Sequence, residues 1–303
     1  MNTKISIIIP TIRDNLYLKA LLEALNQQTF NMSEAEVLVV ADAKDKSTLP
    51  DISLTKTVYL LKQFRNQQKL GPAGARNIGI KESTGEIIAF IDDDCLPPVD
   101  WIEKIAAHFK NKDTQAIAGR IEPYETKTMI QRYCKFANIL NIPKQIETNK
   151  ALYLITANCA LRKNLLEQLN YFNEAYSFAG EDLDLSYRIR KKGIAISYVP
   201  EILVYHHHSP NFLTWLKKYF LYGRGCAQFE VSNQTAELKE YYGKNFKWTK
   251  AITLFKIPLK IFNNLKQEIA LKDALSFPII SYIMNAAFIL GKIYENLNKK
   301  IKK

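Results

Sequence analysis

Three consecutive acidic residues, Asp92, Asp93 and Asp94, directly follow the hydrophobic run EIIAFI at 86–91. Side chains alternate along a strand, so Asp92 and Asp94 are expected to point to one side and Asp93 to the other. Two carboxylates at the end of a buried strand suit a hard divalent cation. Three adjacent acids repel one another unless a positive group lies beside them, which favours a metal site over a solvated turn or a helix cap.

A second acidic pair, Glu181-Asp182, precedes a helix expected over 183–192 and ended by Gly193. An acid at a helix start accepts hydrogen bonds from free backbone N–H groups, and the pattern alone favours such a cap. In a cleft shared with a metal, Asp182 is also well placed to act as a general base.

Arginine and glycine residues occur together in the segment FRNQQKLGPAGARNIGI at 64–80. Gly71 and Gly74 permit a tight turn before a helix, and a helix start with Arg76 beside it is able to hold an anionic or nucleotide group. The segment has no P-loop pattern, so in isolation it favours an ordinary turn.

The only histidine cluster is His206-His207-His208. On an extended segment His206 and His208 share one face. They either complete a metal site, contact phosphate or form a partly exposed strand end, and the residues leave these alternatives open.

The elements that must position these groups alternate between strand and helix. Strands are expected at 4–10, 36–41, 57–61, 86–91, 116–121, 152–158, 194–199 and 202–206, and helices at 15–28, 71–82, 100–109, 129–139, 161–169 and 183–192. The pattern predicts an α/β fold with a mainly parallel, Rossmann-like sheet flanked by helices. Open sheets of this kind bind ligands at the carboxyl ends of their strands.

Composition is that of an ordinary globular protein, with 303 residues, 47% hydrophobic and 24% charged. It excludes a disordered chain, a collagen-like repeat and a small cystine scaffold. The four cysteines lie far apart without a CxxC pattern, which argues against structural zinc and favours a reducing, cytoplasmic compartment. The N-terminal apolar run of five residues predicts no signal peptide.

Positive charge gathers near the C-terminus. The net charge is +12, and twelve lysines against three acids give +9 over residues 244–303. We expect one domain at 1–225 and a basic, helical region at 226–303. Within it, the segment 253–272 mixes lysines with Leu, Ile and Phe, which suits a helix lying on an anionic membrane surface. Its alternatives are a solvated face or packing on the preceding domain. The apolar run 277–290 is shorter than the roughly 20 residues of a membrane span.

Taken together, these motifs resemble the family 2 glycosyltransferases, which have the GT-A fold. The order and spacing of the motifs make this match more specific than any one of them. The matching pieces cover about residues 5–225 and run in the order ISIIIPT, EVLVVAD, GPAGARNIGI, GEIIAFIDDDCLPPVDWIE, TANCALRK, AGEDLDLSYRIRKKG and VPEILVYHHH.

The resemblance implies inverting transfer of a sugar from a nucleotide-sugar to an acceptor hydroxyl, assisted by Mg²⁺ or Mn²⁺. Ala41 stands where the family often has a first acid before Asp42. The implied roles are nucleotide-sugar binding by Pro10, Thr11, Asp42, Arg76, Asp92 and Asp93, metal binding by Asp92, Asp94, His206 and His208, and catalysis by Asp182 as base, with its neighbour Glu181. Many relatives use an acceptor carried on a lipid, which implies work at the cytoplasmic face of a membrane.

Three other functions compete with this one. A nucleotidyltransferase that forms nucleotide-sugars shares the sheet, the acids and the cation, but it needs a glycine-rich loop where this chain has PTIRDN. A nucleic-acid-binding protein is consistent with the basic C-terminal region, yet no zinc-finger, RRM or KH pattern is present. An inactive glycan-binding relative is disfavoured by the intact acids at 92, 94 and 182.

Overall fold

The computed structural model describes residues 5–12, 16–42, 52, 56–66, 71–141, 153–176, 178–232 and 269–301. Its elements are β1 (Ile5–Thr11), α1 (Leu16–Asn26), η1 (Met32–Glu34), β2 (Ala35–Ala41), β3 (Leu60–Arg65), α2 (Gly71–Glu82), β4 (Ile87–Ile91), β5 (Cys95–Leu96), α3 (Trp101–Phe109), β6 (Ala116–Pro123), α4 (Met129–Phe136), β7 (Asn158–Arg162), α6 (Lys163–Gln168), α7 (Glu181–Lys191), β8 (Ser197–His206), α8 (Phe212–Ser232) and α11 (Leu271–Ile301). They form two compact units, Met1–Glu125 with Asn138–Ser177 and Glu181–His208, and Thr126–Ala137 with Phe178–Gly180 and Ser209–Lys303.

The first unit is an eight-stranded sheet in the order β3-β2-β1-β4-β7-β6-β8-β5. Strands β3, β2, β1 and β4 are mutually parallel, whereas β7 runs antiparallel to both β4 and β6. The sheet is therefore mixed, with its parallel half formed by the first four strands. Because β1, β2, β3 and β4 all run the same way, their carboxyl ends meet at one edge.

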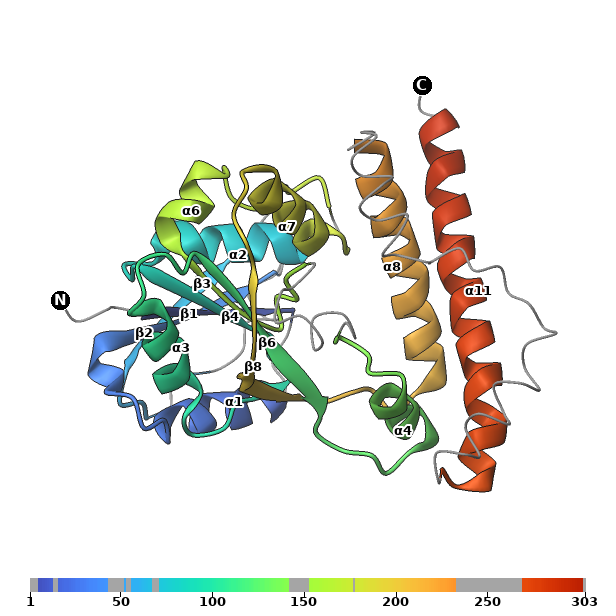
Figure 1. Ribbon diagram of the computed structural model, residues 1–303, viewed down its shortest axis with the longest axis horizontal. Helices are drawn as coiled ribbons and strands as arrows, with labels where there is room; N and C mark the ends of the chain where they lie inside the picture. Colours follow the sequence, from blue (N-terminus) through green and yellow to red (C-terminus); the bar gives the residue numbers. More distant parts are fainter. Residues whose placement is uncertain are drawn as a thin grey trace. The chain divides into compact units, whose positions relative to one another are not determined.

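Helices cover both faces of this sheet, with α1 and α3 on one face and α2, α6 and α7 on the other (Figure 1). Each face has its own core because strand side chains alternate. Ile5, Ile7 and Ile9 of β1 pack with the leucines of α1, whereas Ile8 packs with α2. These two cores fix the strand ends that carry the acidic residues.

Strand β8 is one strand where the sequence predicts two, at 194–199 and 202–206. Its pairing with β6 jumps from Gly119–Val199 to Arg120–Leu203, so residues 200–202 form a bulge. Pro200 has no N–H for the ladder, and Asn158 donates its side-chain amide to the carbonyl of Ile202 at 2.8 Å. The bulge breaks the hydrophobic pattern without ending the strand.

Two other strand predictions were displaced. The strand expected at 57–61 lies at 60–65, where it pairs with β2, and the one expected at 152–158 begins only at Asn158, where β4 offers a partner. In both cases strand pairing, which the local pattern does not contain, sets the bounds.

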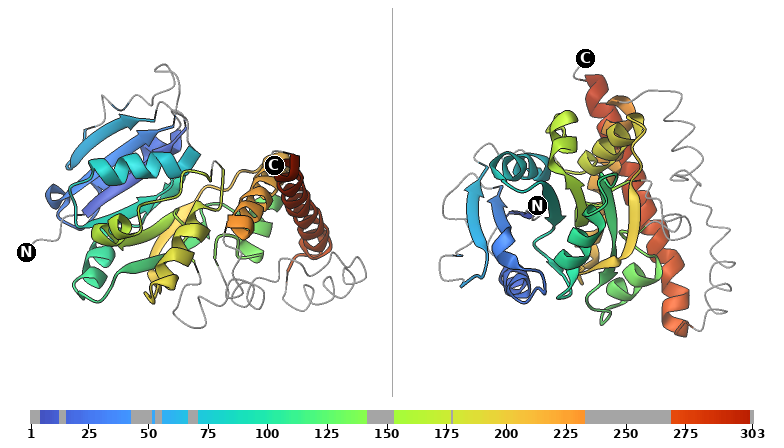
Figure 2. Two further views of the ribbon diagram at one scale, coloured as in Figure 1. Left: turned by 90° about the horizontal axis from the view of Figure 1, so that it is seen from above. Right: turned by 60° about the vertical axis from the view of Figure 1, so that its left-hand side comes forward.

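The second unit is helical, and α8 and α11 lie side by side in all views (Figure 2). Gly223 and Gly291 allow this close approach, because a Cβ on either would collide with the backbone of the other helix. Helix α4 joins α11 through an ion pair of 2.6 Å between Arg132 and Asp273. The domain boundary expected after residue 225 falls inside α8, whereas the compact units divide between His208 and Ser209.

Candidate active site

The three consecutive acids lie in a turn, because β4 ends at Ile91. Each has a different partner. Asp92 accepts a hydrogen bond from Arg76 at 2.9 Å, Asp93 accepts one from the Thr11 hydroxyl at 2.5 Å, and Asp94 lies 3.3 Å from Nε2 of His206. The strand alternation expected for these residues therefore does not apply, since it holds only in extended backbone.

Arg76 is buried on α2 and joins two acids. Its Nη1 donates to Oε1 of Glu181 and its Nη2 to Oδ1 of Asp92, each at 2.9 Å. The guanidinium also lies over the ring of Phe172, with 5.9 Å to the ring centroid. Burial lowers the pKa of Arg76, but Asp92 and Glu181 outweigh it and raise the pKa overall. Arg76 therefore remains a cation that holds the start of α7 beside the acidic turn.

Asp182 follows Glu181 in the first turn of α7 and keeps part of its surface open. Its Oδ1 accepts the N–H of Leu183 at 2.8 Å. Burial and the adjacent charge of Glu181 raise the pKa of Asp182 to about 7, against smaller opposing effects of the Leu183 N–H and Arg76. A carboxyl group with such a pKa is able to accept a proton near neutral pH.

Asp42 and Thr11 lie side by side at the ends of the neighbouring strands β2 and β1. The N–H of Asp42 donates to the carbonyl of Thr11 at 2.8 Å. The carboxylate of Asp42 accepts from the side chain of Asn66 at 2.8 Å and from Gly71 N–H at 3.1 Å. Gly71 has φ 76, a conformation that glycine adopts readily. Asp42 thus anchors the start of α2. Pro10, the other residue expected at the nucleotide site, directly precedes Thr11 on β1.

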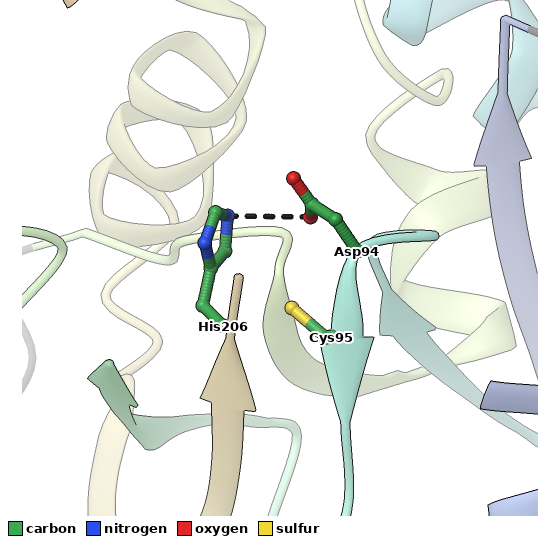
Figure 3. A group of neighbouring side chains, drawn as sticks. All are labelled: Asp94, Cys95 and His206. Carbon is green, nitrogen blue, oxygen red and sulfur yellow. Dashed lines mark ion pairs between the residues drawn. The ribbon is translucent and has the colours of Figure 1, made fainter. Parts of the chain in front are cut away.

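The histidine cluster reaches the acidic turn because β8 pairs with β5, with Cys95 opposite His206. The N–H of His207 extends this pairing by donating to the carbonyl of Asp94 at 2.8 Å. Figure 3 shows His206 and Asp94 pointing toward one another from neighbouring strand ends. The rings of His206 and His208 lie 4.6 Å apart, consistent with the shared face that the sequence predicts.

His207 lies outside this pair, between two tyrosines. Its ring stacks on Tyr17 with 4.4 Å between centroids, and it lies tilted by 43° against Tyr124 with 4.1 Å between centroids. Burial lowers the pKa of His207, which favours its neutral form. The His207 ring thus contacts Tyr17 and Tyr124, whereas the rings of His206 and His208 lie against one another.

Asp94, Cys95 and His206 offer ligand atoms that all lie within 4.8 Å of one another. Burial and the nearby Asp94 and Asp92 charges raise the pKa of the Cys95 thiol, so it stays protonated. A carboxylate oxygen suits Mg²⁺ and Mn²⁺, and an imidazole nitrogen is a better ligand for the transition metal. Asp94 and His206 therefore fit a divalent cation such as Mg²⁺ or Mn²⁺.

Several residues that organise the site carry no sequence signal of their own. Asn66 is bound by Asp42, Phe172 lies under Arg76, and Tyr17 and Tyr124 flank His207. Asn158 accepts from Trp101 Nε1 at 3.0 Å while filling the β8 bulge. Asn66 lies in the segment FRNQQKLGPAGARNIGI and Asn158 in TANCALRK, but neither motif indicated a role for these two asparagines.

The family model described as glycosyl transferase family 2 matches residues 6–169. Glycosyltransferase AglE of Haloferax volcanii is 28% identical over 227 residues, which are 74% of this chain and 73% of that protein.

Solved structures show the same fold. A mannosyltransferase from Pyrobaculum calidifontis, in complex with GDP-Man and Mn²⁺, has a TM-score of 0.71 at 16% identity and covers 99% of this chain and 88% of its own. S. aureus TarS 1–349, in complex with UDP-GlcNAc, has a TM-score of 0.57 at 19% identity, covering 98% and 92%. The family match, which spans more than half of the chain, agrees with this GT-A fold, and the chain therefore belongs to glycosyl transferase family 2 and is a glycosyltransferase.

Proposed function

We propose that the chain transfers a sugar from a nucleoside diphosphate sugar to an acceptor hydroxyl, with inversion at the anomeric carbon. The observation that carries this proposal is Asp182, a carboxyl group with a pKa of about 7 at the start of α7, beside the Arg76 cluster. Similarity to proteins solved with GDP-Man and with UDP-GlcNAc supports a donor of this class.

The donor nucleotide is assigned to the carboxyl ends of the parallel strands. In this proposal Pro10 and Thr11 of β1 line the nucleotide site. At the end of β2, Asp42 is held by its hydrogen bonds with Asn66 and Gly71. Ligands of open α/β sheets bind outside these strand ends. Because both carboxylate oxygens of Asp42 already accept hydrogen bonds, we infer that it shapes the base pocket together with Asn66.

Asp182 is proposed to take the proton of the acceptor hydroxyl as that oxygen attacks the anomeric carbon. A hydroxyl is a weak nucleophile, so proton removal during attack lowers the barrier. A single displacement of this kind inverts the anomeric carbon and needs no carboxylate nucleophile. Glu181 stays bound to Arg76 and acts on catalysis through the pKa of Asp182.

Asp94 and His206 are proposed to hold the metal, with Asp92 and His208 next to them. The bound cation would stabilise the negative charge that develops on the departing nucleoside diphosphate. Asp93 is assigned to the donor site because its carboxylate accepts a hydrogen bond from the hydroxyl of Thr11.

Asp94→Ala is expected to weaken Mn²⁺ binding and to lower turnover, because it removes the carboxylate that faces His206 at 3.3 Å. Asp92→Ala should act more weakly on the metal, since Asp92 is engaged by Arg76, and Asp93→Ala should change metal affinity least. Electron paramagnetic resonance titration of free Mn²⁺ measures the three affinities directly. An Asp93→Ala variant with the largest loss would contradict this order.

The acceptor is proposed to be a cell-surface glycan or a lipid-linked sugar, reached at the cytoplasmic face of a membrane. The basic C-terminal region supports this setting, since twelve lysines lie within residues 244–303. The segment 253–272, expected to lie on the membrane, falls largely outside the described residues.

A binding panel tests the proposed donor site. Calorimetric titration with UDP, GDP and the corresponding nucleotide-sugars, with and without Mn²⁺, should give metal-dependent binding for at least one nucleoside diphosphate. Binding of nucleoside triphosphates in preference to every diphosphate would favour a nucleotidyltransferase instead.

A further inference from the structure

Helix α11 has apolar side chains on two opposite faces. At 3.6 residues per turn, the exposed leucine and isoleucine side chains described on this helix fall within about 100° of arc. They are 44–63% exposed and comprise Leu271, Leu275, Ile279, Leu290, Ile293 and Leu297. We call these six side chains the outer stripe. An apolar face of this length is unusual on the surface of a soluble protein and marks a site of interaction.

The opposite face of α11 accounts for its packing within the second unit. Phe277, Met284 and Phe288 are buried, and Phe277 packs on Tyr133 of α4 at 5.6 Å between ring centroids. This inner face is therefore already occupied by α4 and α8. The outer stripe points the other way and has no role in that packing.

Charge on α11 is sorted between the same two faces. Its two acids within 271–301 are buried and paired, Asp273 with Arg132 at 2.6 Å and Glu295 with Arg224 at 2.8 Å. Lys272, by contrast, is exposed beside the outer stripe, and lysines at 299, 300, 302 and 303 end the chain. The outward side thus combines apolar side chains with positive charge and carries no carboxylate of this helix.

The helix from Leu271 to Asn298 is long and apolar enough to cross a membrane by length and composition. Its ion pairs favour a different placement. Lys292 pairs with Glu230 of α8 at 2.7 Å, and Glu295 accepts from Gln228 of α8 at 2.8 Å. A spanning α11 would bring these charges, with those of α8, into the hydrocarbon, where charged groups are costly.

We propose that the outer stripe of α11 lies on an anionic lipid surface, parallel to it, as the membrane-docking face of this glycosyltransferase. Apolar side chains would enter the interface while the flanking lysines meet anionic headgroups. The inference rests on the proposed function in one respect, because a lipid-linked acceptor gives the enzyme a reason to be held there. It assigns docking to α11, beyond the segment 253–272 that the sequence indicates.

The test is co-sedimentation of the full chain with vesicles of phosphatidylcholine alone or mixed with phosphatidylglycerol. The wild type should bind the mixed vesicles more strongly, and added salt should weaken that binding. Ile279→Asp and Leu290→Asp should each lower the partition coefficient by roughly tenfold or more, because an apolar group is replaced by a charge of the wrong sign. Leu290→Asn separates loss of the apolar group from the added charge.

Asn285→Asp is the matched control, since Asn285 is exposed on α11 about a quarter of a turn away from the centre of the outer stripe. It adds the same charge and should leave binding nearly unchanged. Equal melting temperatures of all variants establish that each is folded. Binding of Ile279→Asp and Leu290→Asp at the wild-type level would overturn the proposal.

Absence of wild-type binding to the mixed vesicles would also overturn it, as would a wild-type dimer that the outer-stripe variants dissociate, detected by light scattering. Hydrolysis of a nucleotide-sugar without vesicles keeps the two claims apart. The stripe variants should retain it in full. Vesicle binding by a protein that hydrolyses no nucleotide-sugar would uphold the docking face and contradict the proposed function.

Discussion

Asp182→Asn should lower the rate of sugar transfer by roughly 10²–10⁴-fold while leaving donor affinity nearly unchanged, since this is the usual contribution of a general base. The substitution keeps the side chain's size and its oxygen for the Leu183 N–H, but it removes the ability to accept a proton. Single-turnover rates and calorimetric donor titration measure the two quantities. Transfer by the variant at near the wild-type rate would exclude Asp182 as the base.

The pH profile gives this prediction a second measurement. The base must be ionised to work, and the pKa of Asp182 is raised to about 7 by burial and by Glu181. For the free wild-type enzyme, kcat/KM should therefore rise with pH through about 7 and level off above it. The residual rate of Asp182→Asn should lack this rise.

The free energy of unfolding should fall with pH over the range in which kcat/KM rises. A raised carboxyl pKa means that the charged form is disfavoured in the folded state, so ionised Asp182 costs stability as pH rises through about 7. Asp182→Asn removes that cost and should melt at a temperature equal to or above that of the wild type at pH 8. A lower melting temperature would mean that the carboxylate supports the fold.

Arg76→Met is expected to destabilise the protein by about 3–5 kcal/mol, because it leaves buried Glu181 and half-buried Asp92 without their cation. Urea unfolding measures the difference. The deficit should shrink as pH falls, since an unpaired buried carboxylate takes up a proton and loses its charge. Arg76→Lys should rescue only in part, because an ammonium does not reproduce the two-pronged geometry.

Arg120→Met provides the control for Arg76→Met. Arg120 pairs with Glu122 at 3.9 Å, with both side chains over a third exposed, and exposed pairs contribute about 0–1 kcal/mol. If the two substitutions cost the same, the buried cluster around Arg76 does not hold α7 to α2.

Features of the fold and the site that depend on neighbouring residues in the chain were predictable from the sequence. The buried strands expected to end at Pro10, Ala41 and Ile91 predict an α/β sheet, and acids that follow a strand end predict a site at its carboxyl edge. Glu181-Asp182 at a helix start was likewise visible as a pair. In each case residue type and near neighbours contain the signal.

The directions of the acids were not predictable in this way. Asp92, Asp93 and Asp94 each have a different partner, which are Arg76, Thr11 and His206 in turn, and these partners come from other elements of the chain. The approach of His206 depends on the pairing of β8 with β5, a two-residue strand that no periodicity predicts. Tertiary pairing decided these positions.

The length of α11 was also not predictable from the sequence. Pro278 and Asn285 interrupt the apolar run 277–290, yet the helix continues from Leu271 to Ile301. Pro278 removes one backbone hydrogen bond, and Asn285 is exposed, so neither breaks the packing of the inner face. Packing against α8 stabilises a helix that its local sequence only weakly favours.

Product analysis with a panel of nucleotide-sugars tests the central claim most directly. The account predicts that one donor, incubated with Mn²⁺ and an acceptor extract, releases nucleoside diphosphate, and that this release is lost without the metal and in Asp182→Asn. Release of pyrophosphate from a nucleoside triphosphate and a sugar phosphate, with no nucleoside diphosphate formed from any nucleotide-sugar, would contradict it.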